Sequence, residues 1–182
     1  MKVSTLYKAG AAAFILSGIL NIIADFLPPT ATRLLNFGGV ATGILGLVAI
    51  YLFQRERVGV FGFISYLVAA FGFIGIAGFL FVDAFVFPYI STTLQEELVN
   101  GATGTAIFMS VIAYVLGVVL FNVASFRAKR YPTPALVLWT IGVLPTLAAT
   151  ALPGFVITIA EITASIGIVW IGSVVWTNDP DT

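Results

Sequence analysis

The chain has 182 residues, of which 60% are hydrophobic and 9% charged, and its mean hydropathy is +1.10. A soluble domain carries roughly 25% charged residues, so these few charges exclude a water-exposed surface of ordinary size. The chain has no Cys, no His and a formal net charge of zero, which excludes disulfides, the common zinc and haem sites, and a basic surface for nucleic acid. We therefore expect an all-α polytopic membrane protein with no cofactor, no metal and no nucleic-acid partner.

Six apolar runs follow one another, each close to the roughly twenty residues that cross a bilayer core. We expect one transmembrane domain over residues 1–182, a bundle of six helices. The first run continues to Leu27 without a small-x-small cleavage site, so it predicts a transmembrane helix rather than a signal peptide. The expected spans are about 7–27, 34–53, 58–87, 103–126, 134–152 and 155–176.

Prolines mark the ends of the first, third and fifth spans. Pro28, Pro88 and Pro153 are 60 and 65 residues apart, a spacing typical of three tandem helical hairpins. Any six-helix chain with short loops has a similar period, because prolines collect near helix ends. The proline spacing therefore does not distinguish a true repeat of helical hairpins from an ordinary six-helix chain.

The longest connection, residues 88–102, is expected to be an external loop that contains a short interfacial helix. Thr93 and Glu96 have the spacing of a capping box, and Gly101 is suited to end the helix. The loop serves either as a tether between hairpins or as a lid or docking surface. The side chains expected on the membrane surface are Leu94, Leu98 and Val99.

Basic residues predict the orientation of the six spans. Seven of the eight lie on one side, and Arg33 alone lies on the other. The positive-inside rule then places both termini in the cytoplasm. In its hydropathy layout the chain resembles six-helix prokaryotic membrane families, which implies a prokaryotic plasma membrane. The seven basic residues on the inner side are Lys2, Lys8, Arg55, Arg57, Arg127, Lys129 and Arg130.

Small residues at helical spacing predict where helices pack closely, since small side chains let backbones approach in lipid. The second span has Gly39 and Gly43 at GxxxG spacing, and the third has Gly72, Gly75 and Gly78. These faces fit contacts within one chain, a homo-oligomer or a larger membrane complex.

Ionisable side chains inside spans are costly and mark candidate functional sites. Asp25, Asp83 and Glu161 all fall in the outer third of their spans, with polar residues at helical spacing nearby. If these faces converge, they form an outward vestibule for a cation, a proton or the polar head of a lipophilic ligand. The candidate ligand- or ion-binding residues are Glu161, Asp83, Asp25, Asn21, Thr146, Thr150, Thr158 and Ser165.

Structural roles compete with that interpretation. Asp25 is within reach of Arg33 across a short loop and so could pin the first hairpin, and Asp83 could bond near its own helix end. Glu161 is the deepest acid and has no basic partner in the spans. Pro145 predicts a break in the fifth span, which is typical both of transporter cavities and of ordinary membrane-helix kinks.

Catalysis is not supported by the sequence. No nucleophile with a suitable base and no phosphate-binding loop is present, and a paired-aspartate site from Asp25 and Asp83 has no supporting motif. We expect a non-catalytic integral membrane protein, either an accessory or structural subunit or a binder of a lipid or other hydrophobic ligand. The alternative is a small cation- or proton-coupled transporter or channel that uses the outward-facing carboxylates.

Overall fold

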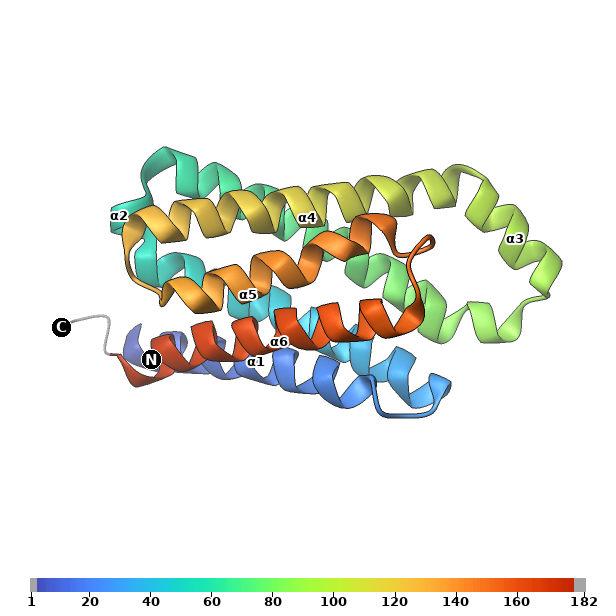
Figure 1. Cartoon of the computed structure of the whole chain (residues 1–182), viewed down its shortest axis with the longest axis horizontal. Helices are drawn as coiled ribbons and strands as arrows, with labels where there is room; N and C mark the ends of the chain where they lie inside the picture. Colours follow the sequence, from blue (N-terminus) through green and yellow to red (C-terminus); the bar gives the residue numbers. More distant parts are fainter. Residues whose placement is uncertain (1–2, 179–182) are drawn as a thin grey trace.

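The computed structural model describes residues 3–178, which are almost entirely helical and contain no strand (Figure 1). Four of the helices are long and apolar enough to cross a membrane, namely α1, α2, α4 and α6. The all-α prediction is confirmed, and the apolar helices are compatible with a membrane protein. The helices are α1 (Val3–Ala24), α2 (Pro29–Phe85), α3 (Thr92–Asn100), α4 (Ala102–Ala128), α5 (Thr133–Val143) and α6 (Gly154–Thr177), with 3-10 helices η1 (Phe87–Tyr89) and η2 (Leu144–Ala148).

The 57-residue α2 folds back on itself at Gly59. Gly59 has φ 58° and ψ −158°, whereas the residues on either side are helical. Side chains placed symmetrically about Gly59 therefore meet: the rings of Tyr51 and Tyr66 stack with their centroids 4.6 Å apart. The break between the expected spans 34–53 and 58–87 falls at Gly59, since residues 54–57 are helical and a single glycine reverses the chain (Figure 1).

Close helix contacts occur where the small-residue pattern predicted them. The Asn21 side chain occupies the space that a Cβ at Gly39 would need, so α1 lies directly on the first half of α2. A Cβ at Gly72 would overlap the backbone of Tyr114 on α4. Gly78 differs from the prediction, because no atom lies within 4 Å of its Cβ position.

Aromatic residues from three helices fill the centre of the bundle. The fully buried indole of Trp139 on α5 meets the rings of Phe14 on α1 and Phe121 on α4 edge-on, at centroid distances of 5.5 and 6.1 Å. Such edge-to-face pairs are a favoured aromatic geometry. α5 therefore packs mainly on α6 and α4, while Val137 and Ile141 on its opposite face are exposed (Figure 1).

The fifth expected span, 134–152, differs from the structure in its second half. The α-helix ends at Val143 and continues as the 3-10 helix η2. Pro145 has no backbone N–H and crowds the preceding turn, so the ordinary helical hydrogen bonding stops there. Thr150 then lies in a turn, and it does not share a helical face with Thr146.

The expected short helix within residues 88–102 is present as α3, and Gly101 ends it as predicted. Its N-cap is Ser91, whose hydroxyl accepts a hydrogen bond from the Leu94 backbone N–H at 3.3 Å. The predicted capping box at Thr93 is therefore wrong, because the N-cap is Ser91, two residues earlier, and the helix begins at Thr92.

Charges separate to the two ends of the bundle. The bend of α2, the start of α1 and the end of α4 lie together at one end (Figure 1), where the Arg127 guanidinium lies 5.5 Å from the Phe61 ring centroid. Arg33 is at the other end, together with five of the six acids among residues 3–178. Lys2 lies outside the described residues. We call the first end the basic end; its basic residues are Lys8, Arg55, Arg57, Arg127, Lys129 and Arg130.

Candidate functional site

Two of the three predicted acids come together. The carboxyl groups of Asp25, in the turn after α1, and Glu161, on α6, are neighbours, and Asp25 Oδ2 is buried without a hydrogen-bond partner among residues 3–178 unless one of the two groups is protonated. Two carboxyl groups share a hydrogen bond only when one of them carries a proton. Partial burial raises the pKa of Asp25, and the bond with Glu161 partly offsets that rise. The pair is therefore suited to hold a proton.

Asp83 does not join this pair. Its carboxylate Oδ2 lies 3.4 Å from the Arg33 Nε, and this is the one salt bridge among residues 3–178. The proposed pairing of Asp25 with Arg33 is wrong, because Arg33 and Asp83 lie at similar distances, 26 and 24 residues, on either side of Gly59 and so face each other across the two halves of α2. In the described part of the chain, no three acids meet as a metal site.

The other predicted site residues are dispersed over several helix contacts. Asn21 lies against Gly39 of α2, and Ser165 is buried where α6 meets Gly18 of α1. Thr158 is half-buried on α6, Thr146 is half-buried in η2, and Thr150 is exposed. These side chains therefore do not form one vestibule around the Asp25–Glu161 pair.

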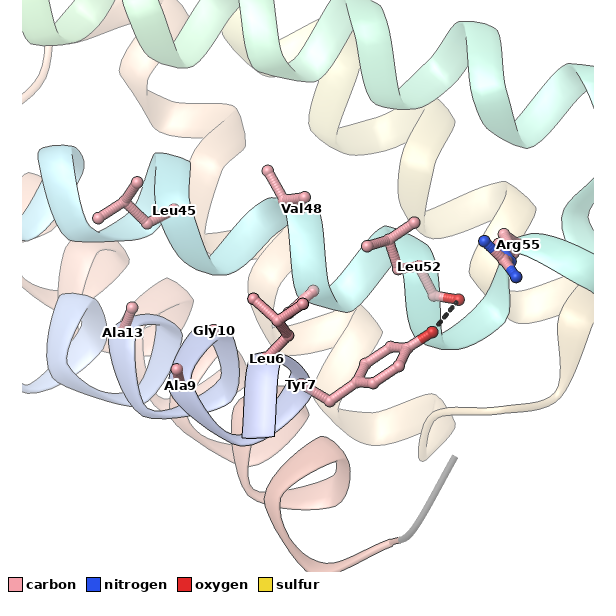
Figure 2. Close-up of a pocket in the computed structure, with 10 residues that line it drawn as sticks. Leu6, Tyr7, Ala9, Gly10, Ala13, Leu45, Val48, Leu52 and Arg55 are labelled. Carbon is pink, nitrogen blue, oxygen red and sulfur yellow. Dashed lines mark hydrogen bonds between the residues drawn. The ribbon is translucent and has the colours of Figure 1, made fainter. Parts of the chain in front are cut away.

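A groove of about 470 Å³ lies between α1 and the first half of α2, and we call it the α1–α2 groove (Figure 2). Ala9, Gly10 and Ala13 give it a floor of small residues on α1. Its α2 wall includes Leu45, which is 66% exposed, so the groove is open to the surroundings. Its size and apolar lining suit a hydrocarbon chain.

The polar groups of the α1–α2 groove gather at its basic end (Figure 2). The Tyr7 hydroxyl donates a hydrogen bond to the Leu52 carbonyl oxygen at 3.4 Å. The exposed Arg55 lies just beyond this bond, with no carboxylate within salt-bridge distance among residues 3–178. The exposed Lys8 follows Tyr7 on α1. The groove is thus apolar along its length and cationic at one end.

Several buried polar residues were missed by the sequence analysis. The Gln54 Nε2 donates to the Ser125 hydroxyl at 2.7 Å, and the Asn122 Nδ2 donates to the Thr140 hydroxyl at 2.9 Å. Asn122 interrupts an otherwise apolar stretch, which is the signal that would have identified it, whereas Gln54 directly precedes the charged residues 55–57 and carries no such signal.

The fold and the two features above define an all-helical protein with an apolar groove and a carboxyl pair at opposite ends. Comparisons with protein-family models, curated proteins and solved structures give no match to this chain.

Proposed function

We propose that this chain is a non-catalytic integral membrane protein that binds an anionic phospholipid in the α1–α2 groove. The observation that carries the proposal is an open apolar groove whose one polar end holds an arginine without a carboxylate partner among residues 3–178. An acyl chain matches the groove, and a phosphate headgroup matches Arg55, with Lys8 nearby. A basic residue near a membrane surface contributes about 1 kcal/mol to binding of anionic lipid.

Lipid retention on the purified protein tests this proposal. Native mass spectrometry after reconstitution in equal amounts of phosphatidylglycerol and phosphatidylcholine should show preferential retention of phosphatidylglycerol. Arg55→Gln should weaken that retention about fivefold, the factor expected for about 1 kcal/mol. Arg57→Gln is the matched control, because Arg57 is also exposed but does not line the groove. Equal losses in the two variants would show a diffuse basic surface and refute the site.

The proposal includes six membrane crossings with both termini on the cytoplasmic side of a prokaryotic plasma membrane. The two halves of α2 would cross separately, since each is longer than the roughly twenty residues required, and α5 with η2 would supply a shorter crossing. The crossings would then form three successive hairpins. The concentration of basic residues at one end supports this orientation.

Single cysteines test the orientation, because the natural chain has none. Arg57→Cys and Glu97→Cys each place a thiol at an exposed position, one at the basic end and one on α3. A membrane-impermeant maleimide added to intact cells should label Glu97→Cys and leave Arg57→Cys unlabelled until the cells are lysed. The opposite pattern would overturn the orientation.

Proton- or cation-coupled transport is the second candidate, and the Asp25–Glu161 pair favours it. Proteoliposomes under a pH gradient should show protein-dependent flux that Glu161→Gln abolishes. Glu97→Gln is the control, because it removes an exposed acid from α3. An absence of flux with the natural chain, or equal flux with Glu161→Gln, would exclude this candidate.

A further inference from the structure

A second groove, between α4 and α5, has a polar floor. We call it the α4–α5 groove; it measures about 260 Å³, and Asn122 and Thr140 line it among apolar side chains. Asn122 is 4% exposed, so its amide is almost completely removed from solvent. A buried amide in an apolar groove is costly unless each of its polar atoms has a partner.

The orientation of the Asn122 amide is determined by its neighbours. Its nitrogen lies 3.3 Å from the Leu136 carbonyl oxygen and 2.9 Å from the Thr140 hydroxyl. A carbonyl oxygen only accepts hydrogen bonds, so the Asn122 atom facing Leu136 must be the NH₂ group. Both amide protons are then used, and the Asn122 Oδ1 is left buried with no partner among residues 3–178.

Two unlike polar groups therefore lie side by side at the floor of the groove, where Asn122 Oδ1 is covered in the ligand-free chain and a ligand reaches it only by displacing the side chains above it. Asn122 Oδ1 is an acceptor that lacks a donor, and the Thr140 hydroxyl, which already accepts from Asn122, still carries a proton to donate. A ligand hydroxyl both donates and accepts, so it complements this pair. Phosphate and ester oxygens of a phospholipid accept only, and they would leave Asn122 Oδ1 without a donor.

Arg127, a cation that lines the groove, contacts an aromatic ring outside it. Arg127 lines the groove, but its guanidinium lies 5.5 Å from the Phe61 ring centroid, over the second half of α2. It is therefore engaged in a cation–π contact. Asn122 precedes Arg127 by five residues along α4, a distance of about 7.5 Å at the helical rise. The polar floor therefore lies further from the basic end of the bundle than Arg127 does.

We propose that the α4–α5 groove binds an uncharged lipid that carries a hydroxyl group, such as a long-chain alcohol. The ligand hydroxyl donates to Asn122 Oδ1 and accepts from the Thr140 hydroxyl, while its hydrocarbon part lies along the apolar walls. This site is separate from the α1–α2 groove and differs from it in the charge of its ligand.

Photolabelling with a matched pair of probes tests the proposal. Hexadecanol and hexadecane, each bearing a diazirine, are added to the protein in phosphatidylcholine nanodiscs, and labelled peptides are identified by mass spectrometry. The alcohol should label the α4–α5 groove at about tenfold lower concentration than the alkane. Equal labelling by both probes, or no saturable labelling by the alcohol, would overturn the proposal and leave only water as a partner for Asn122.

Two variants link the labelling to the polar floor. Thr140→Val keeps the shape of the side chain and should reduce labelling by the alcohol about tenfold, to the level of the alkane. Thr42→Val is the control, because the Thr42 hydroxyl bonds only to carbonyls of its own helix. Asn122→Leu should reduce labelling by the alcohol to the same extent as Thr140→Val. If Asn122→Leu does not fold, Thr140→Val and the comparison of the two probes still test the proposal. Unchanged labelling in Thr140→Val would contradict the proposal.

Competition separates this site from the anionic-lipid site. Phosphatidylglycerol should not displace the alcohol from the α4–α5 groove, and Arg55→Gln should leave alcohol labelling unchanged. Displacement by phosphatidylglycerol would show that the α4–α5 groove accepts anionic lipid, and it would overturn the neutral-ligand assignment without affecting the α1–α2 groove.

Discussion

Replacing Gly59 with alanine tests whether the bend of α2 depends on a conformation restricted to glycine. Its φ of 58° and ψ of −158° lie in a region that is essentially limited to glycine. No atom lies within 4 Å of its Cβ position, so steric crowding contributes nothing and backbone strain accounts for the whole effect. Strain of this kind costs about 1–3 kcal/mol, and each 1.4 kcal/mol changes the folding equilibrium about tenfold.

Gly78→Ala is the matched control for Gly59→Ala. Gly78 lies in the same helix with equally open space around its Cβ position, but its backbone is helical. Alanine there should raise the free energy of unfolding by about 0.5–1 kcal/mol, because glycine is the poorer helix former. Unfolding by SDS in mixed micelles, followed by circular dichroism, measures both variants. If Gly59→Ala proves as stable as Gly78→Ala, the conformational argument for the bend is refuted.

Three further substitutions probe packing, hydrogen bonding and charge in the same unfolding assay. Gly117→Ala should lower the free energy of unfolding by about 1–3 kcal/mol, because its Cβ would overlap the backbone of Ala69; no loss would show that α2 and α4 separate freely. Tyr131→Phe should lower it by about 0.5–1.5 kcal/mol, since the Tyr131 hydroxyl donates to the Ile50 carbonyl oxygen at 2.7 Å. The raised pKa of Asp25 means that the folded chain binds more protons than the unfolded one, so stability should fall as the pH rises from 3.8, the pKa of an unperturbed aspartate, to the raised value. Asp25→Asn should flatten that pH dependence, and an unchanged slope would assign it to another group.

Long apolar runs made parts of the fold predictable. The predicted spans 103–126 and 155–176 agree with α4 and α6 to within two residues at each end, because an apolar segment in lipid must satisfy its backbone internally. The break between the expected spans 34–53 and 58–87 lies a few residues later than predicted for a physical reason. Gln, Arg and Glu are good helix formers, so the charged stretch stays helical, and only the glycine that follows it changes direction.

The candidate site was less predictable, because it depends on which helix faces meet. The position of the α2 bend determines which residue lies opposite Arg33. A shift of the bend by two residues would place a different face of the second half of α2 opposite Arg33. The meeting of Asp25 and Glu161 depends on contact between α1 and α6, which are far apart in the chain. Helical periodicity places residues on a face, but it does not identify the neighbouring helix.

The contact between α1 and α6 has a consequence for biosynthesis. One side of α1 meets α2 as soon as that helix emerges from the ribosome, but its other side packs on the last helix to be made. Gly18 and Gly172, which bring the two backbones together, therefore remain without their final neighbours during most of translation. Asp25 likewise has no contact with Glu161 until α6 has been made. The nascent chain therefore carries an acid without its final neighbour at the end of α1 until synthesis is nearly finished. Ring closure between the first and last helices is then the event that separates a partly folded chain from the finished bundle.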